Sequence, residues 1–332
     1  MKRTAKVLIP AIAATIAITT ANATHPYRTE ADSFLAGLLE SNTGKGQTEA
    51  IRLAIDGDTA PLEAVRNSRN TVPELPPDVT RRQIGERLAL FSCERYRDDA
   101  TPLLVYFHGG GWTIGSINSC SRFCAAMARN GIAVLAADYR LAPEHPFPAG
   151  LTDCVTSVKT AIDSLATWGC KGLAVGGDSS GGNLAIATAM SMPGKEIDAI
   201  VAFYPVTKCY PDNSPSWEEF GTGCALDSDL MQAFNNAYTT DIHNPLVSPA
   251  DAADDELRKL PPTLIVAADR DILKDQGAEF ARRLKSLGNE AAYELVPGSV
   301  HLFITVPGQP SAFGRSVSAA TGFISLHTNA AH

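Results

Sequence analysis

The sequence predicts an α/β fold with a mostly parallel sheet that is covered by helices on both faces. Short continuous apolar runs alternate with segments of helical spacing from residue 101 to residue 296. This alternation is typical of βαβ units whose strands are buried on both sides. Glycines and residues of catalytic types follow several of the apolar runs directly. Because open α/β sheets bind ligands at the carboxyl ends of their strands, we expect the functional site at that edge.

The bulk composition is that of a globular protein. The chain has 332 residues, of which 45% are hydrophobic and 19% are charged, so a large core is available and wholesale disorder is not expected. The formal net charge is −8, and no basic cluster stands out. This balance argues against nucleic acids and anionic membrane surfaces as partners.

The first 23 residues predict a secretory signal peptide. Three basic residues precede the apolar run at 7–18, and Ala21-Asn22-Ala23 supplies small residues for cleavage. The run is shorter than the ~20 residues of a transmembrane span, although an uncleaved membrane anchor is the alternative. We therefore expect an exported protein, periplasmic or secreted, without a stable membrane anchor, in which residues 24–332 form one domain.

The segment before residue 101 predicts helices and loops followed by a strand pair. Helical spacing occurs at 31–40 and 47–57, whereas 58–80 is rich in Pro, Asn and Thr and resembles a loop. Residues 81–96 contain no proline and could pair as antiparallel strands at a sheet edge.

The remaining elements follow from apolar runs and from helix stop signals. Helix C-termini are indicated by Asn130-Gly131 and by Gly288. Residues 207–240 interrupt the alternation and predict an inserted lid. The predicted strands are 103–107, 132–137, 173–176, 199–204, 263–268 and 291–296, and the predicted helices between them include 118–130, 151–167 and 276–287.

Two glycine-rich motifs carry the chemistry. Residues 177–182 read Gly-Asp-Ser-Ser-Gly-Gly, which fits the nucleophile elbow G-x-S-x-G between a strand and a helix. Such a tight turn exposes the Oγ of Ser179 and needs glycines on either side; a plain glycine-rich turn is the alternative. Residues 108–111 read His-Gly-Gly-Gly after a predicted strand, as in an oxyanion-hole loop. We expect Gly109, Gly110 and Ser180 to donate their N–H groups to the oxyanion.

Together these motifs resemble the hormone-sensitive-lipase-like family of α/β-hydrolases. The resemblance extends from about residue 101 to 305 and includes Asp-Tyr-Arg-Leu-Ala-Pro-Glu at 138–144. It implies an α/β-hydrolase fold with an eight-stranded, mostly parallel sheet. It also leaves two segments to form a cap, about 24–75 and 207–240. His108 should brace the glycine loop. Within 138–144, Asp138, Arg140 and Glu144 should form a salt-bridged brace rather than an acid/base group.

The partners of the nucleophile must follow it in the order acid, then histidine. The family pattern selects Asp271 among the acids after the strand at 263–268, with Asp269 as the second choice, whereas Asp275 should begin the next helix. His301 follows the strand at 291–296 and is the expected base. Leu302 stands where the family usually has glycine.

These residues predict a serine carboxylesterase that acts through an acyl-enzyme without a metal or organic cofactor. The family resemblance implies that its substrates are esters of short acyl chains. Trp112 and Tyr204 are candidates for lining the substrate pocket, with core packing as the alternative. An amidase, a peptidase or a lactonase could use the same triad, and a non-catalytic receptor is disfavoured because His301 is present. The expected partner is a small acyl ester; a homodimer remains open.

Seven cysteines permit disulfides in an exported protein but leave at least one thiol unpaired. Cys120 and Cys124 lie four residues apart in a predicted helix, where the Cβ spacing of ~5–6 Å exceeds disulfide reach. Cys209 and Cys224 flank a loop-like stretch and form the preferred bridge.

Overall fold

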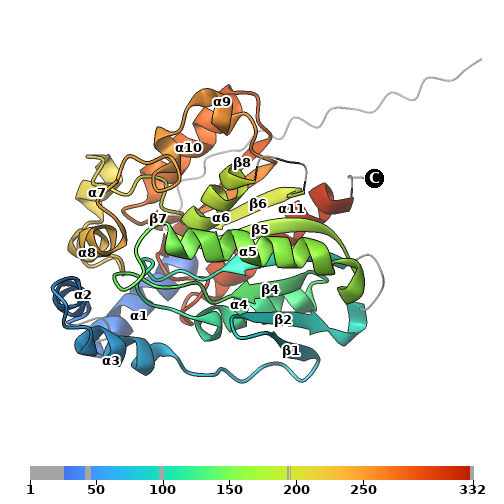
Figure 1. Ribbon diagram of the computed structural model, residues 1–332. Coiled ribbons are helices and arrows are strands. Elements are labelled where there is room, and N and C mark those ends of the chain that lie inside the picture. The colour runs from blue at the N-terminus through green and yellow to red at the C-terminus, as the bar shows by residue number, and fades with distance from the viewer. Residues whose placement is uncertain (1–25, 42–45, 97–100, 193, 195, 330–332) are drawn as a thin grey trace, which may run out of the picture.

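An eight-stranded sheet runs through the centre of the molecule, as predicted (Figure 1). The computed structural model describes residues 26–41, 46–96, 101–192, 194 and 196–329, so the predicted signal peptide lies outside the described residues. The strand order is β1-β2-β4-β3-β5-β6-β7-β8. The first two strands pair antiparallel with each other and β2 pairs antiparallel with β4, whereas all other pairs are parallel. The strands are β1 Val79–Ile84, β2 Leu88–Cys93, β3 Thr101–Phe107, β4 Ala133–Ala137, β5 Cys170–Asp178, β6 Ala199–Phe203, β7 Thr263–Arg270 and β8 Ala291–Val300.

Helices cover both faces of the sheet, as the predicted βαβ alternation requires. On β3, the side chains of Leu103, Val105 and Phe107 join the core beneath α5, α6 and α10. The intervening Leu104 and Tyr106 join the core beneath α4 and α11. Because successive side chains of a strand point to opposite faces, a continuous apolar run is what a strand buried on both sides needs. The helices on the two faces are α4 Ile117–Arg129, α5 Ala149–Ser164, α6 Ser180–Ser191, α10 Lys274–Ser286 and α11 Pro310–Asn329.

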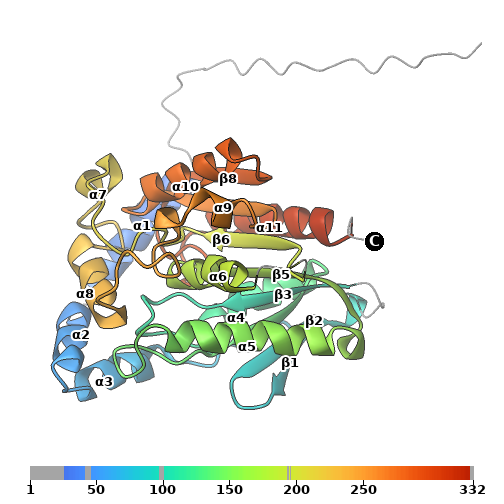
Figure 2. The ribbon, with the colours of Figure 1, turned by 45° about the horizontal axis from the view of Figure 1, so that its top comes forward.

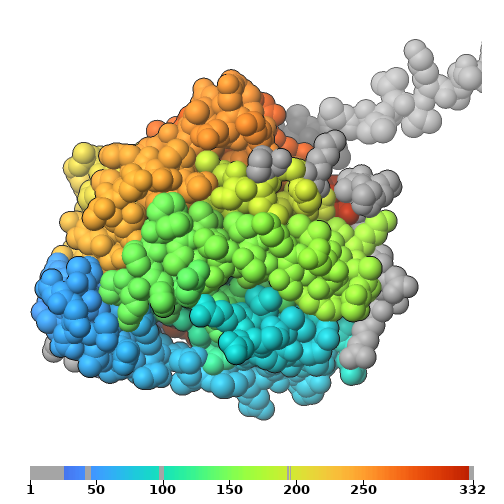
Figure 3. Space-filling model, in the orientation of Figure 1, coloured from blue at the N-terminus to red at the C-terminus, as the bar shows by residue number. Residues whose placement is uncertain are grey.

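The N-terminal segment and the insertion meet over one end of the sheet. Helix α2 packs against α3 and α8, whereas α1 packs against β8 and α11. Figures 1 and 2 show α2, α3 and α8 grouped together, and in the space-filling view the blue N-terminal helices abut the orange chain of the insertion (Figure 3). The helices of this cap are α1 Pro26–Glu40, α2 Gln47–Ile55, α3 Ala60–Arg69, α7 Pro215–Glu219 and α8 Ser228–Tyr238, while the short α9 Asp254–Leu257 follows the insertion.

Part of the segment expected to be a loop is helical. Helix α3 occupies 60–69 within the stretch 58–80, and Pro61 lies in its first turn. A proline there costs no hydrogen bond, because the first N–H groups of a helix have no partner within it. Pro61 therefore marked a helix start, whereas Pro73, Pro76 and Pro77 lie in the non-helical stretch 70–78 that follows.

All seven cysteines lie within the described residues and are unpaired, so the preferred Cys209–Cys224 bridge is not formed. Instead, the thiol of Cys209 donates to Oδ1 of Asn235 over 3.2 Å, and burial raises the pKa of this thiol to about 12. The sulfur atoms of Cys120 and Cys124 are 3.8 Å apart, far longer than a disulfide bond of ~2.05 Å. Within the described ranges, no helix is both long and apolar enough to cross a bilayer.

Candidate active site

Ser179 sits in a strained turn between β5 and α6. Its backbone has φ 54° and ψ −119°, a region that residues with a side chain rarely adopt. The flanking glycines are sterically required: a Cβ on Gly177 would lie 2.3 Å from the backbone of Gly181, and a Cβ on Gly181 would lie 2.0 Å from the carbonyl oxygen of Phe107. The turn therefore has the geometry of a nucleophile elbow.

The structure brings Ser179, His301 and Asp271 into one hydrogen-bonded chain. Oγ of Ser179 lies 3.1 Å from Nε2 of His301. Nδ1 of the same ring lies 2.6 Å from Oδ2 of Asp271. The other carboxylate oxygen, Oδ1, accepts the N–H of Leu273 over 3.0 Å. The side chains of Ser179, His301 and Asp271 are all buried. Such an arrangement can pass a proton from the hydroxyl to the imidazole while the carboxylate orients the ring.

The two other acids near Asp271, Asp269 at the end of β7 and Asp275 in the first turn of α10, are directed elsewhere. Oδ2 of Asp269 accepts the N–H of Gly298 over 2.8 Å, and Oδ2 of Asp275 accepts the N–H of Ser216 over 2.8 Å. Of the three carboxylates, it is Asp271 that contacts His301.

The imidazole of His301 is packed against Tyr204. Their ring centroids are 4.3 Å apart, and Phe303 meets the same tyrosine edge-on at 4.8 Å. The hydroxyl of Tyr204 accepts the N–H of Ile304 over 3.3 Å, which ties the histidine loop to the end of β6. Leu302, in the same loop, has φ 73°, the left-handed conformation that a glycine would adopt more easily. Tyr204 therefore holds the position of the histidine from the core side.

The structure changes the assignment of the oxyanion donors. The N–H of Gly109, expected to face the oxyanion, donates instead to Oδ1 of Asp178 over 3.0 Å. A donor committed to a buried carboxylate is not free for a substrate oxygen. The N–H groups of Gly110 and Gly111 donate to no other described residue. Both have positive φ, 121° and 57°, and a Cβ on Gly111 would meet the Phe234 ring at 2.0 Å.

Asp178 links the glycine loop to the elbow, a role that its place inside the Gly-Asp-Ser-Ser-Gly-Gly motif did not reveal. Besides the N–H of Gly109, its Oδ1 accepts the hydroxyl of Tyr106 over 2.9 Å. Burial raises the pKa of the Asp178 carboxyl, while these hydrogen bonds oppose that shift. The carboxyl group thus fixes the loop at residue 109 from the position directly before Ser179.

His108 braces the glycine loop from the other side. Its Nδ1 lies 2.8 Å from the carbonyl oxygen of Gly109. The hydroxyl of Tyr139 donates to the carbonyl of His108 over 2.7 Å, and the two rings stack with centroids 4.4 Å apart. Aromatic side chains therefore hold the backbone at the start of the loop.

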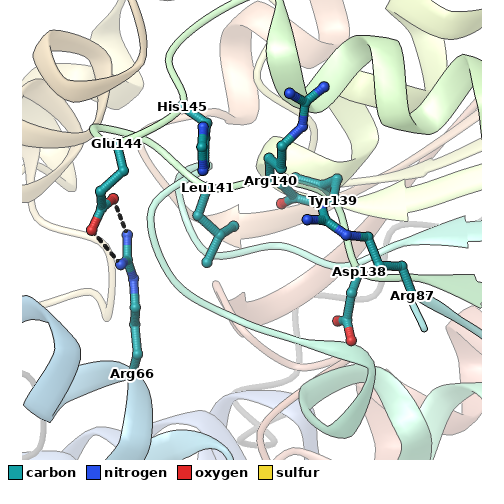
Figure 4. Close-up of a pocket in the computed structure, with 8 residues that line it drawn as sticks. All are labelled: Arg66, Arg87, Asp138, Tyr139, Arg140, Leu141, Glu144 and His145. Atoms are coloured by element: carbon teal, nitrogen blue, oxygen red, sulfur yellow. Dashed lines mark hydrogen bonds and ion pairs between the residues drawn. The ribbon is translucent and has the colours of Figure 1, made fainter.

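The charged residues of 138–144 bind structural partners. Oδ1 of Asp138 accepts the N–H of Ile117 over 2.6 Å, and Arg140 pairs with Asp153 over 2.9 Å. Glu144 forms a two-bond ion pair with Arg66 (Figure 4). These contacts border a polar cavity of about 350 Å³ whose lining residues include none of the hydrogen-bonded chain at Ser179.

Arg66 fastens α3 to the backbone beside the glycine loop. Besides its pair with Glu144, its Nε donates to the carbonyl oxygen of Thr113 over 2.8 Å, and Nη2 donates to that of Ala142 over 2.9 Å. The N–H of Thr113 in turn bonds the carbonyl oxygen of Gly110 over 3.1 Å. No feature of the sequence pointed to this arginine, which lies in the stretch expected to be a loop.

A cavity of about 790 Å³ opens above Ser179 and His301. Its wall combines the glycine loop with cap residues such as Leu38, Gln47 and Leu230. The two candidates for substrate contact, Trp112 and Tyr204, are not among its lining residues. Trp112 is 1% exposed and stacks on Tyr238 at 4.2 Å, and Tyr204 is equally buried. Both candidates are therefore core residues behind the site.

Comparison with known proteins places the chain in a family. Residues 104–305 match a family described as alpha/beta hydrolase fold. A carboxylesterase of Mycobacterium tuberculosis, NlhH, is 33% identical over 236 residues, which cover 67% of this chain and 73% of that protein. An ethyl acetate hydrolase of Pseudomonas putida is 32% identical over 60% of this chain and 65% of its own length.

Solved structures agree. Carboxyl esterase 2 of the fungus Tuber melanosporum superposes with a TM-score of 0.70 at 26% identity, over 80% of this chain and 97% of that one. A thermostable esterase of Pseudomonas putida shares the fold, with a TM-score of 0.78 at 24% identity over 90% and 97%. The chain belongs to the hormone-sensitive-lipase-like family of α/β-hydrolases.

Proposed function

We propose that this protein is a serine carboxylesterase that hydrolyses esters of short acyl chains through an acyl-enzyme. The observation that carries the proposal is the hydrogen-bonded chain Ser179–His301–Asp271 at a cavity, with distances of 3.1 Å and 2.6 Å. Relatives named as carboxylesterase and ethyl acetate hydrolase support ester hydrolysis, and the second name supports a small substrate.

In the first half-reaction, Oγ of Ser179 forms a bond to the ester carbonyl carbon while its proton moves to Nε2 of His301. The carbonyl π electrons move onto the oxygen atom, which becomes an oxyanion. We assign the oxyanion to the N–H groups of Gly110, Gly111 and Ser180, since Gly109 is committed to Asp178. The N-terminus of α6 adds its positive potential at Ser180. Each such donor typically contributes about 10²–10³ to the rate.

Collapse of the tetrahedral intermediate breaks the bond to the leaving oxygen, which takes the proton from His301. Water then attacks the acyl-enzyme, His301 accepts its proton, and return of that proton to Ser179 releases the carboxylic acid. Throughout, Asp271 holds the imidazole in the productive tautomer and stabilises its cationic form.

The test is hydrolysis of p-nitrophenyl esters from acetate to palmitate, with Ser179→Ala as the control variant. We expect the highest kcat/KM of the wild type on esters of short acyl chains. In Ser179→Ala we expect a loss of activity close to that caused by removing all three residues of the proposed triad. Retained activity in Ser179→Ala would overturn the nucleophile assignment. Hydrolysis rates of an anilide and of the matched phenyl ester measure the preference between amide and ester. Faster hydrolysis of the anilide would show that the protein is an amidase rather than an esterase.

A further inference from the structure

We propose that the substrate carries a free carboxylate, which the guanidinium groups of Arg122 and Arg69 bind inside the catalytic cavity. The preferred substrates would then be esters with an anionic group at the end remote from the scissile bond. This inference rests on the proposed esterase function and specifies the substrate class of the same site.

The two arginines enter the cavity from different elements. Arg122 lies in α4, the helix that follows the glycine loop, and Arg69 ends α3 in the cap. Both line the cavity that also contains Ser179 and His301. A ligand held between them would therefore contact the body and the cap at once.

Neither guanidinium has an anionic partner among the residues that the structure describes. Nη1 of Arg122 is buried and has no hydrogen-bond partner within these ranges. Burial lowers the pKa of both groups, and no neighbouring carboxylate acts on either one. Arginine nevertheless remains charged in proteins. A half-buried cation without a partner is costly, and a ligand carboxylate would offset that cost.

Other charges in the cavity wall are already paired or exposed. Arg129 bonds Asp78 over 3.2 Å, and Asp178 is held by Tyr106 and Gly109. Glu74, which also lines the cavity, is exposed. In a chain with a net charge of −8, two guanidinium groups that lack a described anionic partner create a local positive field in this cavity, which favours an anionic ligand.

The side chain of Arg122 is held in place by an aromatic ring. Its guanidinium carbon lies 3.6 Å from the ring centroid of Phe313, which lines the same cavity. This cation–π contact fixes the planar group on one face. The N–H edge of this group, whose Nη1 has no described hydrogen-bond partner, matches a carboxylate with two parallel hydrogen bonds.

The experiment compares charged esters with neutral esters of the same shape. Ethyl hydrogen glutarate carries the carboxylate on the acyl side, and ethyl isoheptanoate is its neutral match. The butyryl ester of γ-hydroxybutyrate carries it on the alcohol side, with isohexyl butyrate as the match. Rates are followed by pH-stat, and Ser179→Ala provides the blank. Each of these two ester pairs is one arm of the experiment. The arm with the higher ratio of kcat/KM for the charged ester to kcat/KM for the neutral ester identifies the side of the scissile bond on which the carboxylate lies.

We expect a ratio above one in one arm, and Arg122→Gln should lower that ratio by about 10- to 100-fold, the usual value of a charge-assisted hydrogen bond. A structural defect would slow both esters equally and leave the ratio unchanged. Arg282→Gln, which removes an exposed arginine on α10, controls for the loss of one positive charge and should keep the ratio.

A second measurement needs no variant. In the wild type, raising the salt concentration should lower the ratio, because screening weakens the attraction of the anionic ester. Ratios below one in both arms, or a ratio unaffected by Arg122→Gln, would overturn the inference. If the neutral esters are hydrolysed in these cases, the esterase function stands without it; if no ester is hydrolysed, the proposed function itself fails.

Discussion

The N–H of Gly109 donates to Oδ1 of Asp178 over 3.0 Å, which joins the glycine loop to the residue that precedes Ser179. The two residues are 69 positions apart in the sequence, and a Cβ on Gly109 would lie 2.3 Å from the carboxylate. The close approach of loop and elbow therefore depends on a glycine and an acid together. This bond also positions the neighbouring Gly110 and Gly111.

Replacing Asp178 tests this link. In Asp178→Ala, Gly109 and Tyr106 lose their common acceptor, so we expect kcat to fall by about 10²-fold as the oxyanion donors lose their alignment. Asp178→Asn keeps an oxygen that can accept both donors, so it should keep most of the activity that Asp178→Ala loses. Steady-state kinetics on p-nitrophenyl butyrate measures both. Equal losses in the two variants would show that charge, rather than hydrogen bonding, matters at this position.

The proposed triad acid can be tested by a pair of isosteric substitutions. Asp271→Asn removes the charge that orients His301, and we expect kcat to fall about 10⁴-fold, as for the equivalent change in a serine protease triad. Asp269→Asn alters an acid that binds the N–H of Gly298 and should cost far less. A larger loss in Asp269→Asn would reverse the assignment. Circular dichroism establishes whether both variants are folded.

Arg66 should contribute to stability, because it ties α3 to the backbone beside the glycine loop. Arg66→Ala leaves the carbonyl groups of Thr113 and Ala142 without this donor, and it removes the partner of Glu144. We expect a loss of about 1–3 kcal/mol in the free energy of unfolding, measured by urea denaturation.

A surface ion pair provides the control for this variant. Arg52→Ala breaks a pair with Asp229 in which both side chains are more than half exposed. Because exposed ion pairs contribute about 0–1 kcal/mol, this variant should lose far less stability than Arg66→Ala. Equal losses in the two variants would remove the special role of Arg66.

The pair of Arg66 and Glu144 also predicts a pH dependence. The hydrogen bond from Arg66 lowers the pKa of Glu144 below its ordinary value of 4.5. A carboxyl group whose pKa is lower in the folded state adds stability above the unfolded pKa, and this stability disappears as the pH falls through the folded pKa. The stability difference between wild type and Arg66→Ala should therefore be full near neutral pH and should shrink below 4.5. Urea denaturation at several pH values measures it, and a difference that grows on acidification would contradict the pairing.

Two helical glycines should respond oppositely to alanine. A Cβ on Gly181 would lie 2.0 Å from the carbonyl oxygen of Phe107, whereas a Cβ on Gly277 in α10 meets nothing closer than 3.6 Å. Gly181→Ala should displace the elbow and abolish activity. Gly277→Ala should stabilise the protein by about 0.4–1 kcal/mol, because alanine loses less chain entropy in a helix. Thermal denaturation and ester hydrolysis compare the two; an active Gly181→Ala would contradict the steric account.

The α/β architecture and the positions of the elbow, the glycine loop and the histidine loop could be predicted from the order of the residues. Apolar runs on both faces of a strand and glycines at tight turns are local requirements, so they are visible in the sequence. The chain order of nucleophile, acid and base also follows from the fold. The expectation of a loop over 58–80 missed α3, although Pro61 in its first turn is a helix-start signal.

The partners and surroundings of several of these residues could not be predicted in this way, because they depend on how sheet, cap and loop pack together. Gly109 donates to Asp178, Trp112 and Tyr204 lie in the core, and Arg66 binds the backbone beside the glycine loop. These contacts join residues far apart in the chain. Helical or strand periodicity identifies the buried face of an element, but the atom that a side chain meets there is fixed by packing across the fold.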